Sequence, residues 1–438
     1  MALKGLDIFK LTPKTNCKEC GNPTCMAFAM KVAQGSISLD KCPHMSADAL
    51  AQLSDAAAPP MKSLSLGTDH NIGGETVLFR HDKTFVSKSL YAVSVDAETV
   101  DKKIPELIKV DYQRIGERMY VELINVEYTG NKEAFLEAVK KAKATGRTLI
   151  LEVKDLDAAA AALEIAGKAL LNGANESNFK EMNELAGKTG VVLGVSGANL
   201  DALYDTVKAL EALGNKNLVL DTTFASIKDA FSAAVQFRRA SIKDGDRSAG
   251  YPSLVNVARL APGNPTMQSA LASLFTMKYG SIIVLEGMTY SQALPLYGLR
   301  QNIFTDPQKP MKVEPGIYPI NGADENAVCA TTVDFALTYF IISGEIERSG
   351  VPVNLLISDA GGYSVLTAWA AGKLSASSMA KFIKEHEIES KIKNRMLLIP
   401  GKVAVLKGEL EESLTGWKIT VAPGEAVGLV KFLKELKD

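Results

Sequence analysis

The sequence lacks the features that mark several classes of protein. Only five cysteines occur among 438 residues, which is too few for a disulfide framework. No run approaches the ~18 uncharged apolar residues that span a bilayer, and residues 1–14 show no apolar signal-peptide core. Forty-nine Lys and Arg balance fifty Asp and Glu, so the net charge of −1 offers nucleic acid no basic field. We therefore expect a cytoplasmic protein without membrane or nucleic-acid partners.

The composition is otherwise that of an ordinary globular protein, with 47% apolar and 23% charged residues. At roughly 150 residues per domain, the length predicts about three domains. The cysteines are unevenly distributed along this length, because four of the five lie within the first 42 residues. That group is the strongest functional signal in the sequence.

The four grouped cysteines follow the pattern C-x2-C-x4-C-x16-C, at Cys17, Cys20, Cys25 and Cys42. Short spacings allow a tight loop to direct three thiolates at one iron–sulfur cluster while a later residue supplies the fourth. Four cysteines with no further ligand favour a [4Fe–4S] centre. Zinc also takes four thiolates, but its usual sites pair two C-x2-C-like knuckles and this chain has one. Unligated structural cysteines, or His44 in place of one thiolate, are further alternatives.

The middle of the chain alternates short β-branched runs with amphipathic helical patterns, beyond a linker expected at 55–60. This order predicts a closed parallel (β/α)8 TIM barrel over about 60–310. Its strands are expected at 76–79, 120–126, 148–153, 169–171, 191–195, 218–221, 253–256 and 282–286. Helices are expected at 132–144, 200–213 and 265–278, and a shorter helix at 26–34 is expected to end at Gly35.

The carboxyl ends of barrel strands form the binding face of such folds. Polar side chains there could hold a pterin, but Asn and Asp are also ordinary caps and turn formers at these junctions. The stretch 69–73 is one residue short of the D-x-H-x-x-G loop whose His binds cobalt in one class of cobalamin proteins. We assign no catalytic residue to the barrel and expect all four histidines of the chain to be surface, capping or core residues. The residues in question are Asn125, Asn172, Asn175, Ser196, Asp221 and Thr222 at strand ends, and the histidines His44, His70, His81 and His386.

From about residue 322 the pattern predicts a small doubly wound, Rossmann-like α/β domain. A long helix is expected at 326–342, a strand at 353–358, a strand–helix unit at 365–371 and 377–385, further strands at 396–400 and 418–421, and a last helix after Pro423. Open parallel sheets bind ligands at the carboxyl ends of their strands, where glycine turns let a large flat molecule approach the backbone. The turns at 359–367, 400–404 and 423–424 are therefore the expected binding edge.

The order of a four-cysteine module, a barrel and a small α/β domain resembles the large (gamma) subunit family of the corrinoid iron–sulfur protein from the acetyl-CoA pathway. The resemblance covers the whole chain and includes the motifs at 73–75, 79–81, 171–175 and 359–362. It implies an iron–sulfur module at 1–57, a TIM barrel at 58–320 and a corrinoid-binding α/β domain at 321–438.

The same resemblance implies a function. The four grouped cysteines would bind [4Fe–4S], and the C-terminal domain would bind a corrinoid whose own base is displaced. The cobalt would carry a methyl group from a methyltetrahydrofolate methyltransferase to acetyl-CoA synthase. The cluster, served by a reductive activator or electron donor, would return Co(II) to Co(I). A small barrel subunit would complete a heterodimer and cover the other face of the corrinoid.

The expected corrinoid contacts lie on the three turns and on the first part of the helix expected at 326–342. Glycines would let the backbone approach the ring, and hydroxyls would bond its amides without acting as a strong axial ligand. Cys329, in the same expected helix, should be an inert core residue. The expected contacts are Asn326, Thr331, Thr332, Asp359, Gly361, Gly362, Tyr363, Ser364, Val365, Thr367, Pro400, Gly401, Val403, Ala404, Pro423 and Gly424.

Two other functions fit the same residues. One is an iron–sulfur electron-transfer or redox-sensing subunit without a corrinoid, whose C-terminal domain binds a nucleotide or a partner. The other makes the barrel a pterin-dependent enzyme and the remaining modules accessory. A visible spectrum separates the first from a corrinoid protein, because corrinoid bands shift on reduction and methylation. Binding of methyltetrahydrofolate to the barrel would favour the second.

Overall fold

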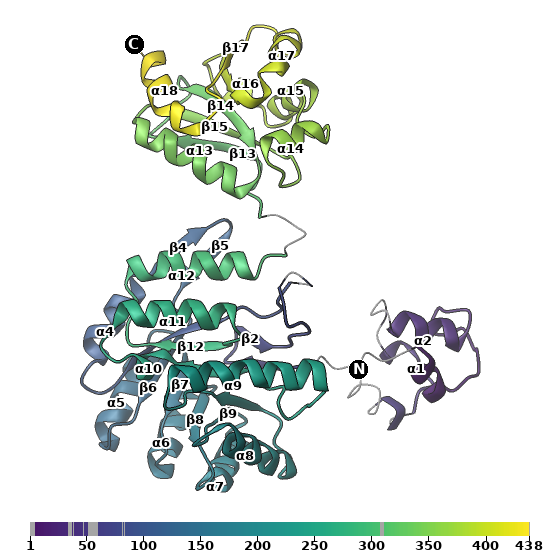
Figure 1. Cartoon of the computed structure of the whole chain (residues 1–438), viewed down its shortest axis with the longest axis vertical. Coiled ribbons are helices and arrows are strands. Elements are labelled where there is room, and N and C mark those ends of the chain that lie inside the picture. The colour runs from purple at the N-terminus through teal and green to yellow at the C-terminus, as the bar shows by residue number, and fades with distance from the viewer. Residues whose placement is uncertain are drawn as a thin grey trace. The chain divides into compact units, whose positions relative to one another are not determined.

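The computed structural model describes residues 5–33, 37, 39–46, 48–50, 60–80, 82, 84–306 and 311–437 (Figure 1). The chain divides into two compact units, one of Met1–Asp111 with Tyr120–Phe304 and the other of Tyr112–Met119 with Thr305–Asp438. The three expected domain ranges, 1–57, 58–320 and 321–438, remain predictions. His81, Gly35 and all of the expected linker except Pro60 lie outside the described residues.

The cysteine-bearing segment folds around a small apolar core. Helix α1 (Gly5–Leu11) packs on α2 (Cys25–Ala33), and a 3-10 turn η1 (Leu39–Lys41) follows. The expected helix at 26–34 thus matches α2 within one residue. The core contains Ile8, Phe28 and Cys42, and the half-buried Cys20 packs against it. Hydrophobic packing therefore returns the segment of the fourth cysteine to the loop of the first three.

Eight parallel strands close into a barrel in sequence order, with the last strand paired to the first. This confirms the expected TIM barrel. The strands are β3 (Leu90–Val95), β6 (Leu123–Glu127), β7 (Thr148–Glu152), β8 (Leu170–Ala174), β9 (Val192–Val195), β10 (Leu218–Asp221), β11 (Ser253–Asn256) and β12 (Ile282–Leu285). The helices around them are α4 (Val100–Ile108), α5 (Lys132–Lys143), α6 (Leu156–Ala166), α7 (Phe179–Thr189), α8 (Leu200–Ala212), α9 (Ile227–Arg239), α10 (Val257–Leu260), α11 (Pro265–Met277) and α12 (Tyr290–Ile303).

An antiparallel hairpin of β1 (Ser63–Leu66) and β2 (His70–Gly73) closes the amino end of the barrel. Its buried Leu66 and Ile72 pack against the layer formed by the first residues of the strands, such as Leu90 and Leu123. A second hairpin, β4 (Asp111–Arg114) with β5 (Glu117–Tyr120), separates α4 from β6. Apolar side chains thus fill the interior of the barrel at its amino end.

The expected first barrel strand at 76–79 is wrong. The structure places irregular chain there, and the first strand is β3, all six residues of which are buried. The chain before this irregular segment is anchored by Glu75, whose carboxylate accepts hydrogen bonds from the Val86 and Ser87 N–H groups. The β-branched run at 76–79 has a strand's composition but pairs with no strand in the described part of the chain, which shows how strongly tertiary context decides β-structure.

The C-terminal sheet has the order β13 (Gly316–Ile320), β15 (Val353–Ser358), β14 (Val328–Val333), β16 (Met396–Ile399), β17 (Lys418–Val421). Strand β13 is an antiparallel edge that begins before residue 321, and the other four strands are parallel. Successive parallel strands therefore run to one side of β14 and then to the other. This is the doubly wound topology, and its switch point lies between β14 and β16.

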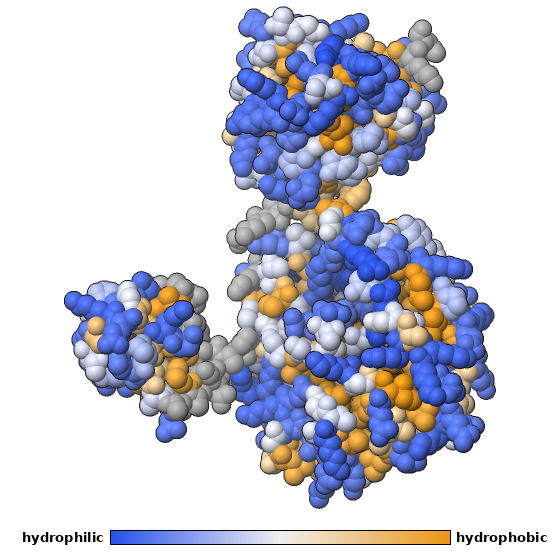
Figure 2. Space-filling model, turned by 180° about the vertical axis from the view of Figure 1, so that it is seen from behind, coloured by the Kyte–Doolittle hydropathy of each residue, from blue (hydrophilic) through white to orange (hydrophobic). Residues whose placement is uncertain are grey.

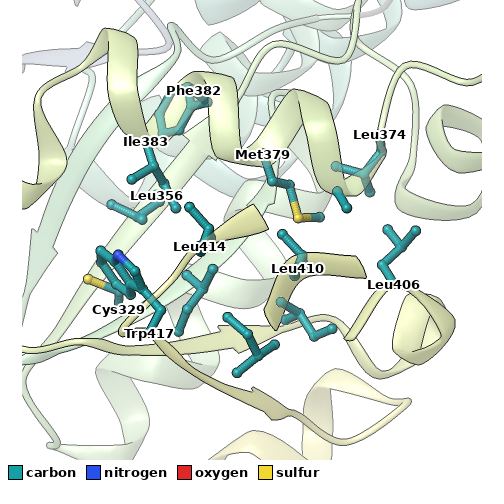
Figure 3. Close-up of a cluster of buried hydrophobic side chains, with 14 of the residues drawn as sticks. Cys329, Leu356, Leu374, Met379, Phe382, Ile383, Leu406, Leu410, Leu414 and Trp417 are labelled. Carbon is teal, nitrogen blue, oxygen red and sulfur yellow. The ribbon is translucent and has the colours of Figure 1, made fainter. Parts of the chain in front are cut away.

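Helices cover both faces of this sheet. One face packs on α13 (Ala336–Ser349) and α18 (Leu429–Lys437). The other packs on α14 (Val365–Ala370), α15 (Ala376–Glu385) and α17 (Lys407–Ser413), and its core includes Cys329 and Trp417 (Figure 3). Short helices α16 (Ile388–Lys391), η3 (Gly401–Leu406) and η4 (Ala426–Gly428) join these elements. Cys329 is fully buried, and burial raises the pKa of its thiol to about 12.

Two expected elements of this domain are wrong. The helix expected at 326–342 is strand β14 followed by α13, because 328–333 lies in the middle of the sheet, where β-branched Thr331, Thr332 and Val333 fit well. Cys329 consequently lies on a strand. The strand expected at 365–371 is helix α14, of which Ala368 alone is fully buried. One-sided burial suits a surface helix and not a strand inside a sheet.

No described helix combines the length and apolar character needed to cross a membrane. Hydrophilic side chains cover much of the face shown in Figure 2, with smaller apolar patches between them.

Candidate functional site

The loop that carries the first three cysteines has an unusual backbone. Asn16, Lys18 and Gly21 have φ values of 49°, 67° and 75°. Left-handed residues alternating with ordinary ones turn successive N–H groups toward one side and form concavities that bind anions, including iron–sulfur clusters. The Asn16 side chain fixes this shape by accepting the Cys25 N–H at 2.8 Å. These φ values and this hydrogen bond are compatible with a loop that wraps an anionic group.

Asn22 supplies a second observation that fits a cluster. It is buried, and its amide nitrogen lies 3.1 Å from the Cys20 carbonyl oxygen and 3.6 Å from Cys20 Sγ. Hydrogen bonds to ligand sulfurs are one of the ways in which proteins tune cluster potentials. Its Oδ1 is buried without a partner among the described groups. The grouped cysteines range from exposed Cys17 to buried Cys25 and Cys42, so one side of the site faces solvent.

His44 lies beside this loop and not within it. Its Nε2 is 2.8 Å from Glu19 Oε2, and both side chains are about half exposed or more. The Cys17 sulfur, a Glu19 oxygen and a His44 nitrogen lie within 4.8 Å of one another. The solvated position agrees with the interpretation of His44 as a turn residue, and its nearness to Cys17 leaves the alternative ligand role open.

A cavity of about 270 Å³ opens at the carboxyl ends of β14, β16 and β17, at the switch point of the C-terminal sheet. Apolar residues of α13 and α18 form its inner wall, among them Ile346 and Leu433. Half of the expected contacts line it, namely Thr331, Thr332, Ser364, Val365, Pro400, Gly401, Pro423 and Gly424. The turns after three strands thus meet as the topology requires.

Several expected contacts lie elsewhere. Asn326 precedes β14, and therefore lies at the opposite, amino edge of the sheet, where Asn394 donates to its carbonyl oxygen. The prediction that Asn326 lies at the binding edge of the sheet is therefore wrong, because the helix expected at 326–342 begins with a strand. The others follow the ends of β15 and β16 without lining the cavity: Asp359, Gly361, Gly362, Tyr363, Thr367, Val403 and Ala404.

Two ionic features of this edge were not anticipated from the sequence. Lys402 Nζ lies 3.0 Å from Glu425 Oε1, and both residues line the cavity. Asp334, which follows β14, is fully buried and accepts backbone N–H groups from the glycine turn after β15. In the sequence, Lys402 follows a single glycine and Asp334 follows a β-branched run. Both patterns are common at protein surfaces, so the sequence does not mark either residue as part of a site.

At the carboxyl end of the barrel, polar side chains form more hydrogen bonds and ion pairs with one another than the sequence indicates. Asn172 Nδ2 donates to Glu152 at 2.7 Å and to Asp221 at 2.9 Å, and Arg259 Nη1 lies 3.2 Å from Glu152. Burial, and then the Asp221 charge, raise the pKa of Glu152 to about 7. By contrast, Asn175 Oδ1 accepts the Ser177 N–H within its own turn, and Ser196 Oγ donates to the Ala174 carbonyl oxygen at the end of the neighbouring strand β8. Arg259 lies among the carboxylates of this network, whereas Asn172 Oδ1 is buried without a partner among the described groups.

Comparisons with known proteins place the chain in a family. The CO dehydrogenase/acetyl-CoA synthase delta subunit family matches residues 65–433. The corrinoid/iron-sulfur protein large subunit of Moorella thermoacetica is 39% identical over 445 residues, which cover 99% of this chain and 99% of that protein. The chain belongs to the family of this large subunit. The resemblance inferred from the cysteine module, the barrel and the α/β domain is therefore confirmed.

Further comparisons agree with membership of the large-subunit family. An Fe-S cluster family matches residues 13–44, which contain the four grouped cysteines. Gamma subunits of the acetyl-CoA decarbonylase/synthase complex are similar over nearly the whole chain: that of Methanothermobacter thermautotrophicus is 31% identical, covering 100% of this chain and 99% of its own, and that of Archaeoglobus fulgidus 32% identical, covering 95% of each. Both expected cofactors, a corrinoid and an iron–sulfur centre, appear in the name of the Moorella relative, which confirms them at the level of the family.

Among solved structures, dihydropteroate synthase from Thermus thermophilus in complex with 6HMPPP aligns with a TM-score of 0.40 and 14% identity, covering 56% of this chain and 100% of that one.

Proposed function

We propose that this chain is a methyl carrier of the acetyl-CoA pathway, which holds a corrinoid at the carboxyl edge of its C-terminal sheet and a [4Fe–4S] cluster on Cys17, Cys20, Cys25 and Cys42. The observation that carries the proposal is the cavity at the β14/β16 switch point, because that is where doubly wound sheets take large cofactors. Bound there, the corrinoid would supply a cobalt that takes a methyl group from methyltetrahydrofolate on a methyltransferase and gives it to acetyl-CoA synthase, while the cluster would supply the electron that restores oxidised cobalt.

The cavity's own residues fit such a cofactor. Thr332 is 2% exposed, and its Oγ1 has no partner among the described groups, so a ligand amide would satisfy it. The described residues that line the cavity include no His, Cys or Met, which agrees with a site that offers cobalt no strong lower ligand. Ser364 Oγ and Thr367 Oγ1 lie 2.9 Å apart at the same edge and provide further hydroxyls.

The glycines of the turns after β16 and β17 have different roles at this edge. A Cβ on Gly401 would lie 2.4 Å from the Ala422 carbonyl oxygen, so the turns after β16 and β17 touch through this glycine. A Cβ on Gly424 would meet nothing within 4 Å. Gly424 therefore faces open space that the proposed ligand would fill, and its own backbone does not require glycine.

Gly424→Leu tests the proposal, with Gly408→Leu in α17 as a matched control, since a Cβ there also meets nothing within 4 Å. Both variants should fold. We expect Gly424→Leu to lose cobalt and methylation from methyltetrahydrofolate while keeping its iron, and Gly408→Leu to retain all three. Normal cobalt content and methylation in Gly424→Leu would refute the site. Native protein with iron but no corrinoid spectrum would refute the function and support an electron-transfer subunit.

The proposed partners follow from the same role. They are a small corrinoid iron–sulfur protein subunit, a methyltetrahydrofolate methyltransferase, acetyl-CoA synthase, and a reductive activator or electron donor. The names of the relatives support subunit status, since one is a large subunit and others are gamma subunits of a complex. Co-purification of the chain with a small subunit under anaerobic conditions tests the first partner.

A further inference from the structure

Asp334 is the most completely enclosed carboxylate at the cavity edge. It follows the last residue of β14, and its own N–H donates to the Ser358 carbonyl oxygen at 3.1 Å. Its side chain is 0% exposed, and its Oδ1 accepts the N–H groups of Ala360 and Gly362, each at 3.0 Å. Oδ2 lies 3.1 Å from the Gly362 nitrogen. One buried acid therefore ties the turn after β15 to the end of the neighbouring strand.

Lys312 provides the counter-charge from a separate segment. Its Nζ lies 3.5 Å from Asp334 Oδ2 and 3.5 Å from Asp359 Oδ1. Its small degree of burial alone would lower its pKa, but the Asp334 and Asp359 carboxylates raise it, so the lysine remains charged. The segment is also held by its backbone, because the Val313 N–H donates to the Asp334 carbonyl oxygen at 2.8 Å.

The turn held by this carboxylate leads directly to the cavity wall. Gly361 and Gly362 have φ values of 73° and 78°, and the left-handed Gly361 lies between the two residues, Ala360 and Gly362, whose N–H groups reach Asp334. Two residues later Ser364 begins the cavity-lining run that includes Val365 and Leu366. The position of that wall thus depends on where Asp334 holds the turn.

We propose that Asp334 is a positioning residue for the corrinoid: it fixes the glycine turn so that the wall formed by Ser364, Val365 and Leu366 lies at the distance that the cofactor requires. The inference rests on the proposed function and deepens it. Hydrogen bonds to a charged group are among the strongest in proteins, and a buried N–H that loses its acceptor is costly. Removing the carboxylate should consequently loosen the turn more than the rest of the sheet.

The first measurement uses the full chain without cofactor. Asp334→Ala should speed amide hydrogen exchange at Gly362 by at least about tenfold, since the Ala360 and Gly362 N–H groups lose their carboxyl acceptor. Asp334→Asn keeps one oxygen acceptor, so its exchange rate at Gly362 should lie between those of Asp334→Ala and the native protein. Lys312→Met, at a half-exposed position, should speed the same exchange to a smaller extent. Lys393→Met, which breaks the Lys393–Glu325 pair at the amino edge, is the control and should leave Gly362 unchanged.

The second measurement loads each variant with a corrinoid and records cobalt retention and the visible spectrum. We expect Asp334→Asn and Lys312→Met to release cobalt about tenfold faster than native protein and to shift its bands, with the iron content unchanged. Exchange at Gly362 and cobalt retention equal to native in both variants would overturn the role of Asp334. Native protein that retains no corrinoid would instead overturn the proposed function, so the two failures are distinguishable.

Discussion

Replacing Glu152 by Gln should change how the barrel's stability depends on pH. The Glu152 carboxylate is nearly enclosed at the carboxyl end of β7, where it accepts a hydrogen bond from Asn172 and faces Arg259 at 3.2 Å. Burial is the main cause that raises its pKa from 4.5 to about 7, and the nearby Asp221 charge adds to it. Gln can keep the hydrogen bond from Asn172 but cannot titrate.

The sign follows from proton binding. Between pH 4.5 and about 7 the folded barrel holds a proton on Glu152 that the unfolded chain has released. The contribution of protonated Glu152 to the free energy of unfolding is complete below pH 4.5 and is lost as the pH rises through about 7. One pKa unit corresponds to about 1.4 kcal/mol, so the difference between the two values corresponds to about 3 kcal/mol as an upper limit.

Hydrogen exchange of barrel amides provides a domain-specific assay. We would measure the free energy of opening at strand positions such as Ile150 and Leu171 between about pH 5 and 8, corrected for intrinsic exchange rates. As the pH rises across this range, the free energy of opening of the native protein should fall by up to about 3 kcal/mol relative to that of Glu152→Gln.

The control is Glu286→Gln. Hydrogen bonds from Gln268 and then the Gly263 N–H lower the pKa of Glu286, so its contribution is complete above pH 4.5 and stays constant across the same range. If the free energies of opening of native protein and Glu152→Gln depend on pH in the same way, the raised pKa of Glu152 is refuted.

The sequence predicts most of the barrel because buried parallel strands have a distinctive composition. The run 218–221 is short, apolar up to its last residue Asp221 and followed by a capped helix, and the structure has a strand with those bounds. The first strand was missed for the converse reason. Leu90–Val95 includes Ala and Ser and has less β-branched character than 76–79, and only the pairing of β3 with β6 and β12 makes it a strand. Pairing partners far away in sequence leave no local pattern.

The same limit applies to the ligand edge of the C-terminal sheet. Turns at 400–401 and 423–424 could be predicted because each follows an unmistakable strand, and the carboxyl ends of parallel strands meet. The run 328–333 also has helical spacing of apolar residues, and its position between β15 and β16 decides for a strand. The sequence does not reveal the pairing of Asp334 with Lys312, because the two residues lie 22 positions apart and neither belongs to a motif. Their roles depend on distances that only the folded chain shows.

The remaining predictions concern the cluster and the barrel. Cys20→Ala and Cys42→Ala should abolish retention of iron while corrinoid stays bound, whereas Cys329→Ala should keep iron because this thiol lies in the core of the C-terminal sheet. Full iron in the first two variants, or stoichiometric zinc in native protein, would contradict the cluster assignment. Asn172→Ala and Asp221→Ala should leave methyl transfer close to normal, because these two side chains bond to each other and we expect the barrel to act as a scaffold and docking surface. If folded variants that keep both cofactors lose most of the transfer rate, the carboxyl end of the barrel takes part in the reaction and the scaffold interpretation is wrong.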